Sequence, residues 1–130
     1  MRQARQQLVD TLLPTIEIEV PADEEPLDPV RLFAENVQEI WLEIGFGSGE
    51  HLAQQAIDNP SVGIIGCEPY INGVARLLAD IDHHDLKNVR IFRDDARILL
   101  RAMQDQSISK AFILFPDPWP KMRHHKRRIV

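Results

Sequence analysis

The sequence predicts an α/β protein with a Rossmann-like, doubly wound parallel sheet. Three observations predict this fold class. Between residues 39 and 115, short apolar runs alternate with segments of helical periodicity. A glycine-rich turn at residues 45–49 joins the first apolar run to the first helical segment, and a carboxylate, Glu68, follows the second run. Strands that alternate with helices form parallel sheets with right-handed crossovers, and such sheets bind ligands at the carboxyl ends of their strands.

The amino-terminal residues precede this pattern. Residues 3–13 predict a short amphipathic helix that ends at Pro14. Residues 17–35 are rich in acids and prolines, which predicts an extended connector without a core. The chain is therefore expected to divide into an amino-terminal helix with an acidic connector, residues 1–38, and a sheet domain, residues 39–130.

The elements of the sheet domain follow one another at short intervals. We expect strands at residues 39–44, 62–67, 89–93 and 110–115, and helices at residues 49–57, 71–81 and 96–103. Apolar stripes at helical spacing mark the core faces of the last two helices. A sheet that ends at its fourth strand would expose an edge, which predicts partial disorder or self-association.

The composition is that of a soluble domain. Of the 130 residues, 44% are hydrophobic and 27% are charged, and no apolar stretch approaches the roughly 20 residues that span a bilayer. The amino terminus lacks the apolar core of a signal peptide, so we expect a cytoplasmic protein without membrane contact. We expect a monomer or a weak homodimer. The single cysteine, Cys67, excludes an internal disulfide and is interpreted as a small buried hydrophobe.

Basic charge is concentrated near the carboxyl terminus. Residues 121–128 hold five of the fifteen Lys and Arg residues and no acid, although the net charge of the chain is −5. Such a strip on an acidic protein is typical of a phosphate-binding surface, and a solvated basic tail is the alternative. Because the strip follows a proline-rich block that contains Asp117, we favour binding to an RNA backbone.

The glycine turn predicts an adenosine-containing cofactor. Gly45, Gly47 and Gly49 would let a ligand approach the backbone, and the helix after them begins with unpaired N–H groups. Roughly twenty residues later, Glu68 stands where a carboxylate could accept both ribose hydroxyls. A nicotinamide dinucleotide is an alternative ligand, although its fingerprint would favour a glycine where Glu50 stands.

Four motifs carry a resemblance to a known family: residues 42–47, residues 66–68, Asn88-Val89-Arg90 with Asp95-Ala96, and residues 115–130. From about Ile40 onward the chain resembles the bacterial tRNA (guanine-N7)-methyltransferases. The resemblance implies a class I methyltransferase fold, S-adenosylmethionine as cofactor, and formation of N7-methylguanosine in the variable loop of tRNA. Family members usually continue beyond the basic strip, so the chain resembles the front half of such an enzyme.

The resemblance also implies roles for single residues. It implies Asp117 as the catalytic residue. It implies cofactor contacts for Glu43, Gly45, Gly47, Gly49, Glu68, Asp95 and Asp117. For the basic strip we expect contacts with tRNA, made by Lys121, Arg123, His124, His125, Lys126, Arg127 and Arg128.

The acidic residues also have alternative interpretations. A carboxylate inside an apolar strand is costly to bury, so Glu43 should meet loop amides or the methionine moiety of the cofactor. Glu68 could instead cap a helix or lie at the surface. Asp95 could bond the adenine amino group or only cap the helix that follows it, with Asp94 as its exposed neighbour.

Methyl transfer to guanine N7 needs no strong base, since N7 already presents a lone pair. The enzyme must align N7, the methyl carbon and the sulfur, and must stabilise the positive charge that moves onto the purine. Asp117, held between prolines just past the last expected strand, suits that task, and a role confined to shaping the proline turn is the alternative. Trp119 either stacks on an extruded base or packs inward.

Metal binding is not expected. The pairs His83-His84 and His124-His125 consist of adjacent residues whose side chains should diverge, and no metal-ligand spacing involves Cys67. The alternative from a different functional class is a non-catalytic RNA-binding piece, which would bind tRNA without methyl transfer.

Overall fold

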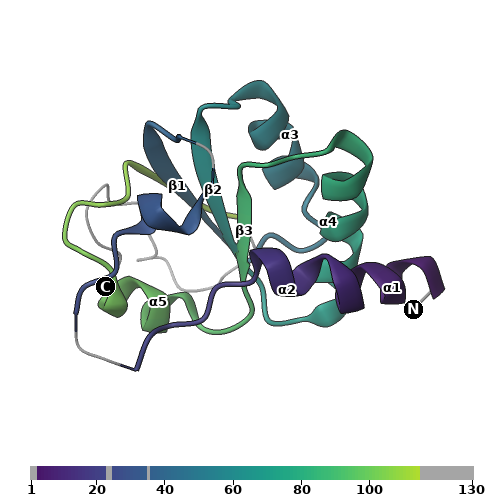
Figure 1. Cartoon of the computed structure of the whole chain (residues 1–130), viewed down its shortest axis with the longest axis horizontal. Helices are drawn as coiled ribbons and strands as arrows, with labels where there is room; N and C mark the ends of the chain where they lie inside the picture. The colour runs from purple at the N-terminus through teal and green to yellow at the C-terminus, as the bar shows by residue number, and fades with distance from the viewer. Residues whose placement is uncertain (1–2, 23–24, 35, 115–130) are drawn as a thin grey trace.

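The computed structural model describes residues 3–22, 25–34 and 36–114. Four parallel strands, β1 (Glu39–Ile44), β2 (Val62–Cys67), β3 (Val89–Phe92) and β4 (Lys110–Ile113), form one sheet in the order β3-β2-β1-β4 (Figure 1). The chain therefore builds the sheet outward from β1 to β3 and then returns to the other side of β1. This topology confirms the Rossmann-like prediction and places the switch in strand order between β1 and β4.

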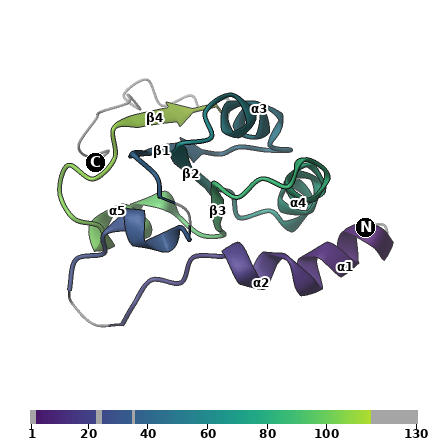
Figure 2. The same ribbon diagram turned by 45° about the horizontal axis from the view of Figure 1, so that its top comes forward.

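The helices lie on both faces of the sheet. Figure 2 shows α3 (Glu50–Asp58) and α4 (Ile71–His84) on one face and α5 (Ala96–Ala102) on the other. No helix in the described ranges is both long enough and apolar enough to cross a membrane. The bounds of β1 and β2 are those expected from the sequence, whereas α4 runs three residues further than its apolar stripe.

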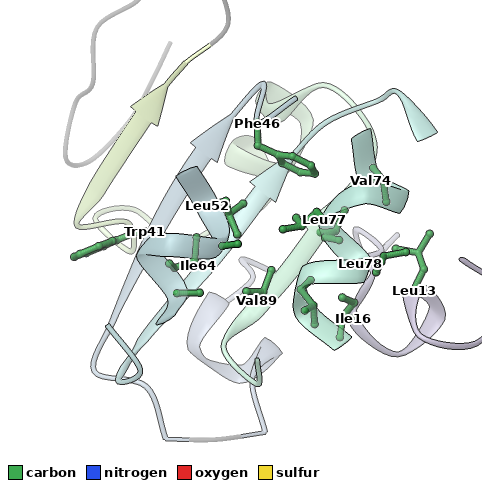
Figure 3. Close-up of a cluster of buried hydrophobic side chains, with 14 of the residues drawn as sticks. Leu13, Ile16, Trp41, Phe46, Leu52, Ile64, Val74, Leu77, Leu78 and Val89 are labelled. Carbon is green, nitrogen blue, oxygen red and sulfur yellow. The ribbon is translucent and has the colours of Figure 1, made fainter. Parts of the chain in front are cut away.

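Alternate strand residues face the two cores. Trp41 and Ile64 point into the core beneath α3 and α4, whereas Leu42 and Ile65 point into the core beneath α5. Figure 3 shows the first of these cores, in which the side chains of α4 pack on those of the sheet. Its largest side chains without solvent contact include Leu52, Ile64, Leu77, Leu78 and Ile91. The two cores fix the register of the sheet, because a one-residue slip would turn every apolar side chain to the wrong face.

The amino-terminal segment differs from its expected form. The helix α1 (Gln3–Thr11) ends before Pro14, and a second short helix, α2 (Leu13–Ile16), carries Pro14 in its first turn. The N–H groups of a first helical turn have no partner within the helix, so the missing N–H of proline breaks no hydrogen bond there. The helix α1 lies along α4, and α2 packs against β3 (Figure 1).

The expectation of a connector without a core is wrong. Ile18 is 5% exposed and Phe33, just after the short helix η1 (Pro29–Leu32), is 7% exposed, and both belong to the core beneath α5. The Ile18 N–H donates to the Ile91 carbonyl at 2.8 Å, so the connector runs beside the edge of β3. Prolines prevent regular ladder pairing but not the burial of apolar side chains between them. In the described part of the chain no strand pairs with the outer edge of β4, and self-association through it stays a prediction.

A buried side-chain amide just before β3 bonds three carbonyls at the other end of the sheet. Asn88, 4% exposed, precedes β3, and its Nδ2 donates to the carbonyls of Ala56, Asn59 and Val62 at 3.2, 3.0 and 2.9 Å. The amide thereby connects the end of α3, the turn after it and the start of β2.

Replacing this amide should destabilise the fold. Asn88→Ala removes the three hydrogen bonds that the buried amide donates, and we expect a loss of about 2 kcal/mol in the free energy of unfolding, measured by urea denaturation. Gln54→Ala is the control, because that amide bonds Asp58 at the exposed surface of α3; it should change the free energy by less than about 0.5 kcal/mol. Equal effects of the two substitutions would contradict the anchoring role of Asn88.

Candidate functional site

The carboxyl ends of β1 and β2 meet at the glycine loop, which we define as residues 45–49. In the parallel register Ile44 lies opposite Cys67, and the Gly45 N–H donates to the Cys67 carbonyl at 2.8 Å. The ladder thus continues one residue into the loop. As a result the loop leaves β1 beside Glu68, the residue that follows β2.

The backbone of the loop depends on its glycines. Gly45, Gly47 and Gly49 have φ angles of +70°, +62° and +84°, a region that residues with side chains adopt at a cost. Between them, the Phe46 side chain is 5% exposed and inserts into the core beneath α3 and α4 (Figure 3). The loop is therefore anchored by one aromatic side chain while its glycine backbone stays uncovered by side chains of its own.

Glu68 holds the loop from the side of β2. It is 6% exposed, its Oε1 accepts from the Gly47 N–H at 2.8 Å, and its Oε2 accepts from the Tyr70 N–H at 3.3 Å. The alternative of a surface residue is wrong because the side chain is buried, and α4 has no side-chain cap. Each carboxylate oxygen has a second lone pair, so both can still accept from a ligand.

The loop also packs on the first turn of α4. A methyl group built at Gly73 would overlap the carbonyl oxygen of Gly47. Since that oxygen belongs to the backbone, no side-chain rotation could make room. The close approach of Gly47 to Gly73, together with the Glu68 bond, fixes the loop between β2 and α4.

Glu43 is a buried carboxylate with one partner. It is 1% exposed, and its Oε1 lies 2.7 Å from Nδ1 of His51, in the first turn of α3. Its Oε2 is buried and has no hydrogen-bond partner among the described residues. Burial raises the pKa of the Glu43 carboxyl, and the hydrogen bond from His51 acts in the opposite direction. Of the two partners expected for Glu43, the loop amides do not meet it among the described residues, and the methionine moiety stays a prediction. The observed partner is a histidine that we did not predict.

Asp95 caps the helix that follows it. Its Oδ1 accepts from the Arg97 N–H at 2.9 Å, and its Oδ2 accepts from the Arg97 guanidinium at 2.7 Å. These bonds lower the pKa of Asp95. Asp95 therefore caps the helix, and a bond to an adenine in addition to this cap stays a prediction. Asp94 is exposed, as expected.

The remaining predicted residues give mixed outcomes. Cys67 is buried, and burial raises the pKa of its thiol to about 12, as suits a hydrophobe rather than a nucleophile. The rings of His83 and His84 do not diverge: they meet edge to face with centroids 4.7 Å apart. Within the described ranges no group of three His, Cys, Asp or Glu residues could hold a metal ion.

Asp117, Trp119 and the basic strip lie outside the described residues. β4 lies next to β1 and points along it, so its carboxyl end is at the same edge of the sheet as the glycine loop. Leu114, the last described residue, still donates its N–H to the Ile44 carbonyl at 3.3 Å. The roles of the residues beyond it stay predictions.

A cavity of about 230 Å³ lies elsewhere, against the start of β3 and the end of α4. Its lining includes Ile16, Ile81 and Arg90 and contains none of the candidate residues. The Arg90 guanidinium is occupied by the carbonyls of Leu32 and Val89 and by the ring of Phe33. The candidate site is therefore the carboxyl edge of the sheet and not this cavity.

Comparison with known proteins shows the family to which the chain is similar. Residues 37–130 match a family described as "Putative methyltransferase". The chain is 50% identical over 124 residues to a tRNA (guanine-N(7)-)-methyltransferase of Paramagnetospirillum magneticum, covering 95% of this chain and 52% of that relative. It is 50% identical over 130 residues to the protein of the same name in a Caulobacter species, covering 100% of this chain and 55% of that relative. The chain spans about half the length of the curated relatives it matches.

Solved structures share the fold at low sequence identity. The 16S rRNA methyltransferase KamB superposes with a TM-score of 0.57 at 16% identity, covering 78% of this chain and 48% of that chain. An antibiotic-related methyltransferase superposes with a TM-score of 0.53 at 20% identity, covering 65% of this chain and 44% of that chain. At these identities the likeness shows a common fold.

Filling the contact between the loop and α4 should destabilise the protein. In an open helix, Gly→Ala would stabilise by about 1 kcal/mol. At Gly73 the added methyl group meets the Gly47 carbonyl, so we expect Gly73→Ala to lower the free energy of unfolding by about 2 kcal/mol, measured by urea denaturation. Asn72→Ala, at the exposed neighbouring position, is the control and should stay within about 0.5 kcal/mol of the wild type. A stabilising Gly73→Ala would contradict the close contact.

Burial of Glu43 should make stability depend on pH. The pKa of Glu43 is raised above 4.5, the value expected for the unfolded chain. The protonated carboxyl therefore favours the folded state below the unfolded pKa, and this stabilisation is lost as the pH rises through the folded pKa. Relative to Glu43→Gln, the wild type should therefore lose stability between about pH 4.5 and neutral pH. Urea denaturation of both proteins across this range measures the difference. A difference that is constant, or that moves in favour of the wild type as the pH rises, would contradict the raised pKa.

Proposed function

Because the chain belongs to the methyltransferase family that its residues 37–130 match, we propose that it transfers a methyl group from S-adenosylmethionine to N7 of a guanosine in the variable loop of tRNA. One observation carries this proposal. The relatives that share half of their residues with the chain over nearly its whole length are named tRNA (guanine-N(7)-)-methyltransferases. The fold and the geometry of the glycine loop support the same reaction class.

The cofactor would lie across the carboxyl ends of three neighbouring strands. Glu43 is the last but one residue of β1, Glu68 follows β2, and Asp95 follows β3. We assign the ribose hydroxyls to Glu68, the methionine moiety to Glu43 and the adenine amino group to Asp95. When bound, the cofactor supplies an electrophilic methyl group on a sulfonium.

The described residues fit such a cofactor in two ways. The Oε2 of Glu43 is buried and has no partner among the described residues, and a cationic amino-acid moiety would provide the missing donor. The glycine loop presents backbone that no side chain of its own covers, and Glu68 keeps acceptor capacity beside it. A carboxylate and a glycine loop at neighbouring strand ends suit a nucleoside with an attached charged group.

The substrate side is assigned to residues beyond the described ranges. Asp117 would lie near the guanine and stabilise the purine as it becomes cationic, without acting as a base. Lys121 and the other basic residues of the strip would contact the tRNA backbone. A tRNA substrate implies a cytoplasmic enzyme, and we propose that it acts as a monomer or weak homodimer.

The nicotinamide alternative is not favoured. Glu50 occupies the position of the last glycine in the dinucleotide fingerprint, and the matched family is one of methyltransferases. The alternative of a non-catalytic RNA-binding piece would leave unexplained the buried carboxylates at the sheet edge, which RNA phosphates would repel.

Calorimetric titration with S-adenosylmethionine, run beside NAD, tests the cofactor. We expect binding of the former alone, and at least tenfold weaker binding by Glu68→Gln, which places an N–H donor where Oε2 accepts from Tyr70. Glu50→Gln is the matched control: it lies exposed beside the loop and should bind like the wild type. Binding of NAD alone would contradict the proposal. Incorporation of labelled methyl groups into tRNA, with the product nucleoside identified by mass spectrometry, then tests the substrate.

A further inference from the structure

We propose that His51 is a positioning residue of the cofactor site: its Nδ1–H donates to Oε1 of Glu43 and leaves Oε2 to accept from the cationic amino group of the bound cofactor. This inference rests on the proposed function and assigns to His51 a role in holding the ligand's amino-acid moiety. His51 acts through Glu43 and touches neither the methyl group nor the guanine.

The two oxygens of Glu43 differ in what they meet. Oε1 lies 2.7 Å from Nδ1 of His51, whereas Oε2 has no partner among the described residues, although the side chain is only 1% exposed. A buried carboxylate oxygen without a donor is costly, and such groups are rare except at functional sites. A ligand ammonium would supply that donor together with a compensating charge.

Aromatic contacts hold the imidazole in place. The ring of His51 meets Phe112 edge to face, with centroids 5.0 Å apart, and Phe112 lies opposite Glu43 in the β1–β4 register. Phe112 in turn meets Trp41 edge to face at 6.0 Å. The His51 side chain is 39% exposed, although its Nδ1 is bonded to the buried carboxylate.

No other charge compensates Glu43 in the described part of the chain. Across the strand register it faces Gly66 of β2 and Phe112 of β4. The ammonium of Lys110 lies over the rings of Trp41 and Phe112, at 4.3 and 5.7 Å from their centroids. Burial raises the pKa of Glu43, and His51 supplies both the hydrogen bond and the charge that lower it. Without His51 the carboxyl would hold its proton to higher pH and would no longer attract an ammonium.

Two substitutions separate positioning from packing. His51→Leu removes the donor, whereas His51→Asn places an amide nitrogen where Nδ1 stands and cannot titrate. S-Adenosylhomocysteine carries the amino-acid moiety, and 5′-methylthioadenosine lacks it. Calorimetry at neutral pH should show about tenfold weaker binding of S-adenosylhomocysteine by His51→Leu, little change for His51→Asn, and unchanged binding of 5′-methylthioadenosine by both. Binding of S-adenosylhomocysteine by His51→Leu should recover as the pH rises, because Glu43 then ionises.

A second readout needs no ligand. Nitrogen-15 shifts of the His51 ring in the free protein should report a proton on Nδ1, and Glu43→Leu should abolish that preference. A proton on Nε2 alone in the wild type would overturn the inference. So would equal losses for both ligands in His51→Leu, since a general disturbance of the loop weakens both. Failure of the wild type to bind either ligand, with the Nδ1 proton present, would instead contradict the proposed function.

Discussion

The hydrogen bond between the Gly47 N–H and the Glu68 carboxylate is the contact on which the candidate site depends. It joins the end of β2 to a loop that begins at the end of β1, and it requires the positive φ angle that glycine adopts without strain. The parallel register places Cys67 opposite Ile44, so that Gly47, in the loop after β1, lies close to Glu68, which follows β2. Gly73 completes the arrangement, because any side chain there would push the loop away from α4.

The buried carboxylate of Glu43 lowers the stability of the fold, but it provides a polar group for the candidate site. A charge in an apolar strand next to two dense cores is retained against its desolvation penalty, with one donor from His51. Burial of apolar side chains in the two cores on either side of the sheet offsets this loss of stability. By contrast, the Asn88 amide, which serves the fold, donates to three backbone carbonyls.

The sequence predicted what depends on local pattern and missed what depends on contacts across the fold. The strands 39–44 and 62–67 were predicted to the residue, because apolar runs there are bounded by turns. The buried connector was missed because its few apolar residues stand between acids and prolines. The Glu43–His51 contact spans a turn between a strand and a helix, so neither helical nor strand periodicity predicts it. The last turn of α4 is polar, so the spacing of its apolar residues predicted a shorter helix than the one observed.

The central claim is that the carboxyl edge of the sheet, and not the cavity beside Arg90, binds S-adenosylmethionine. The most direct measurement is a titration of the nitrogen-15 labelled protein, followed by its backbone amide signals. The proposed site predicts shifts at residues 45–49 and 68–73 with S-adenosylmethionine and none there with NAD. Shifts confined to residues 81–90, or the same shifts with both ligands, would contradict it.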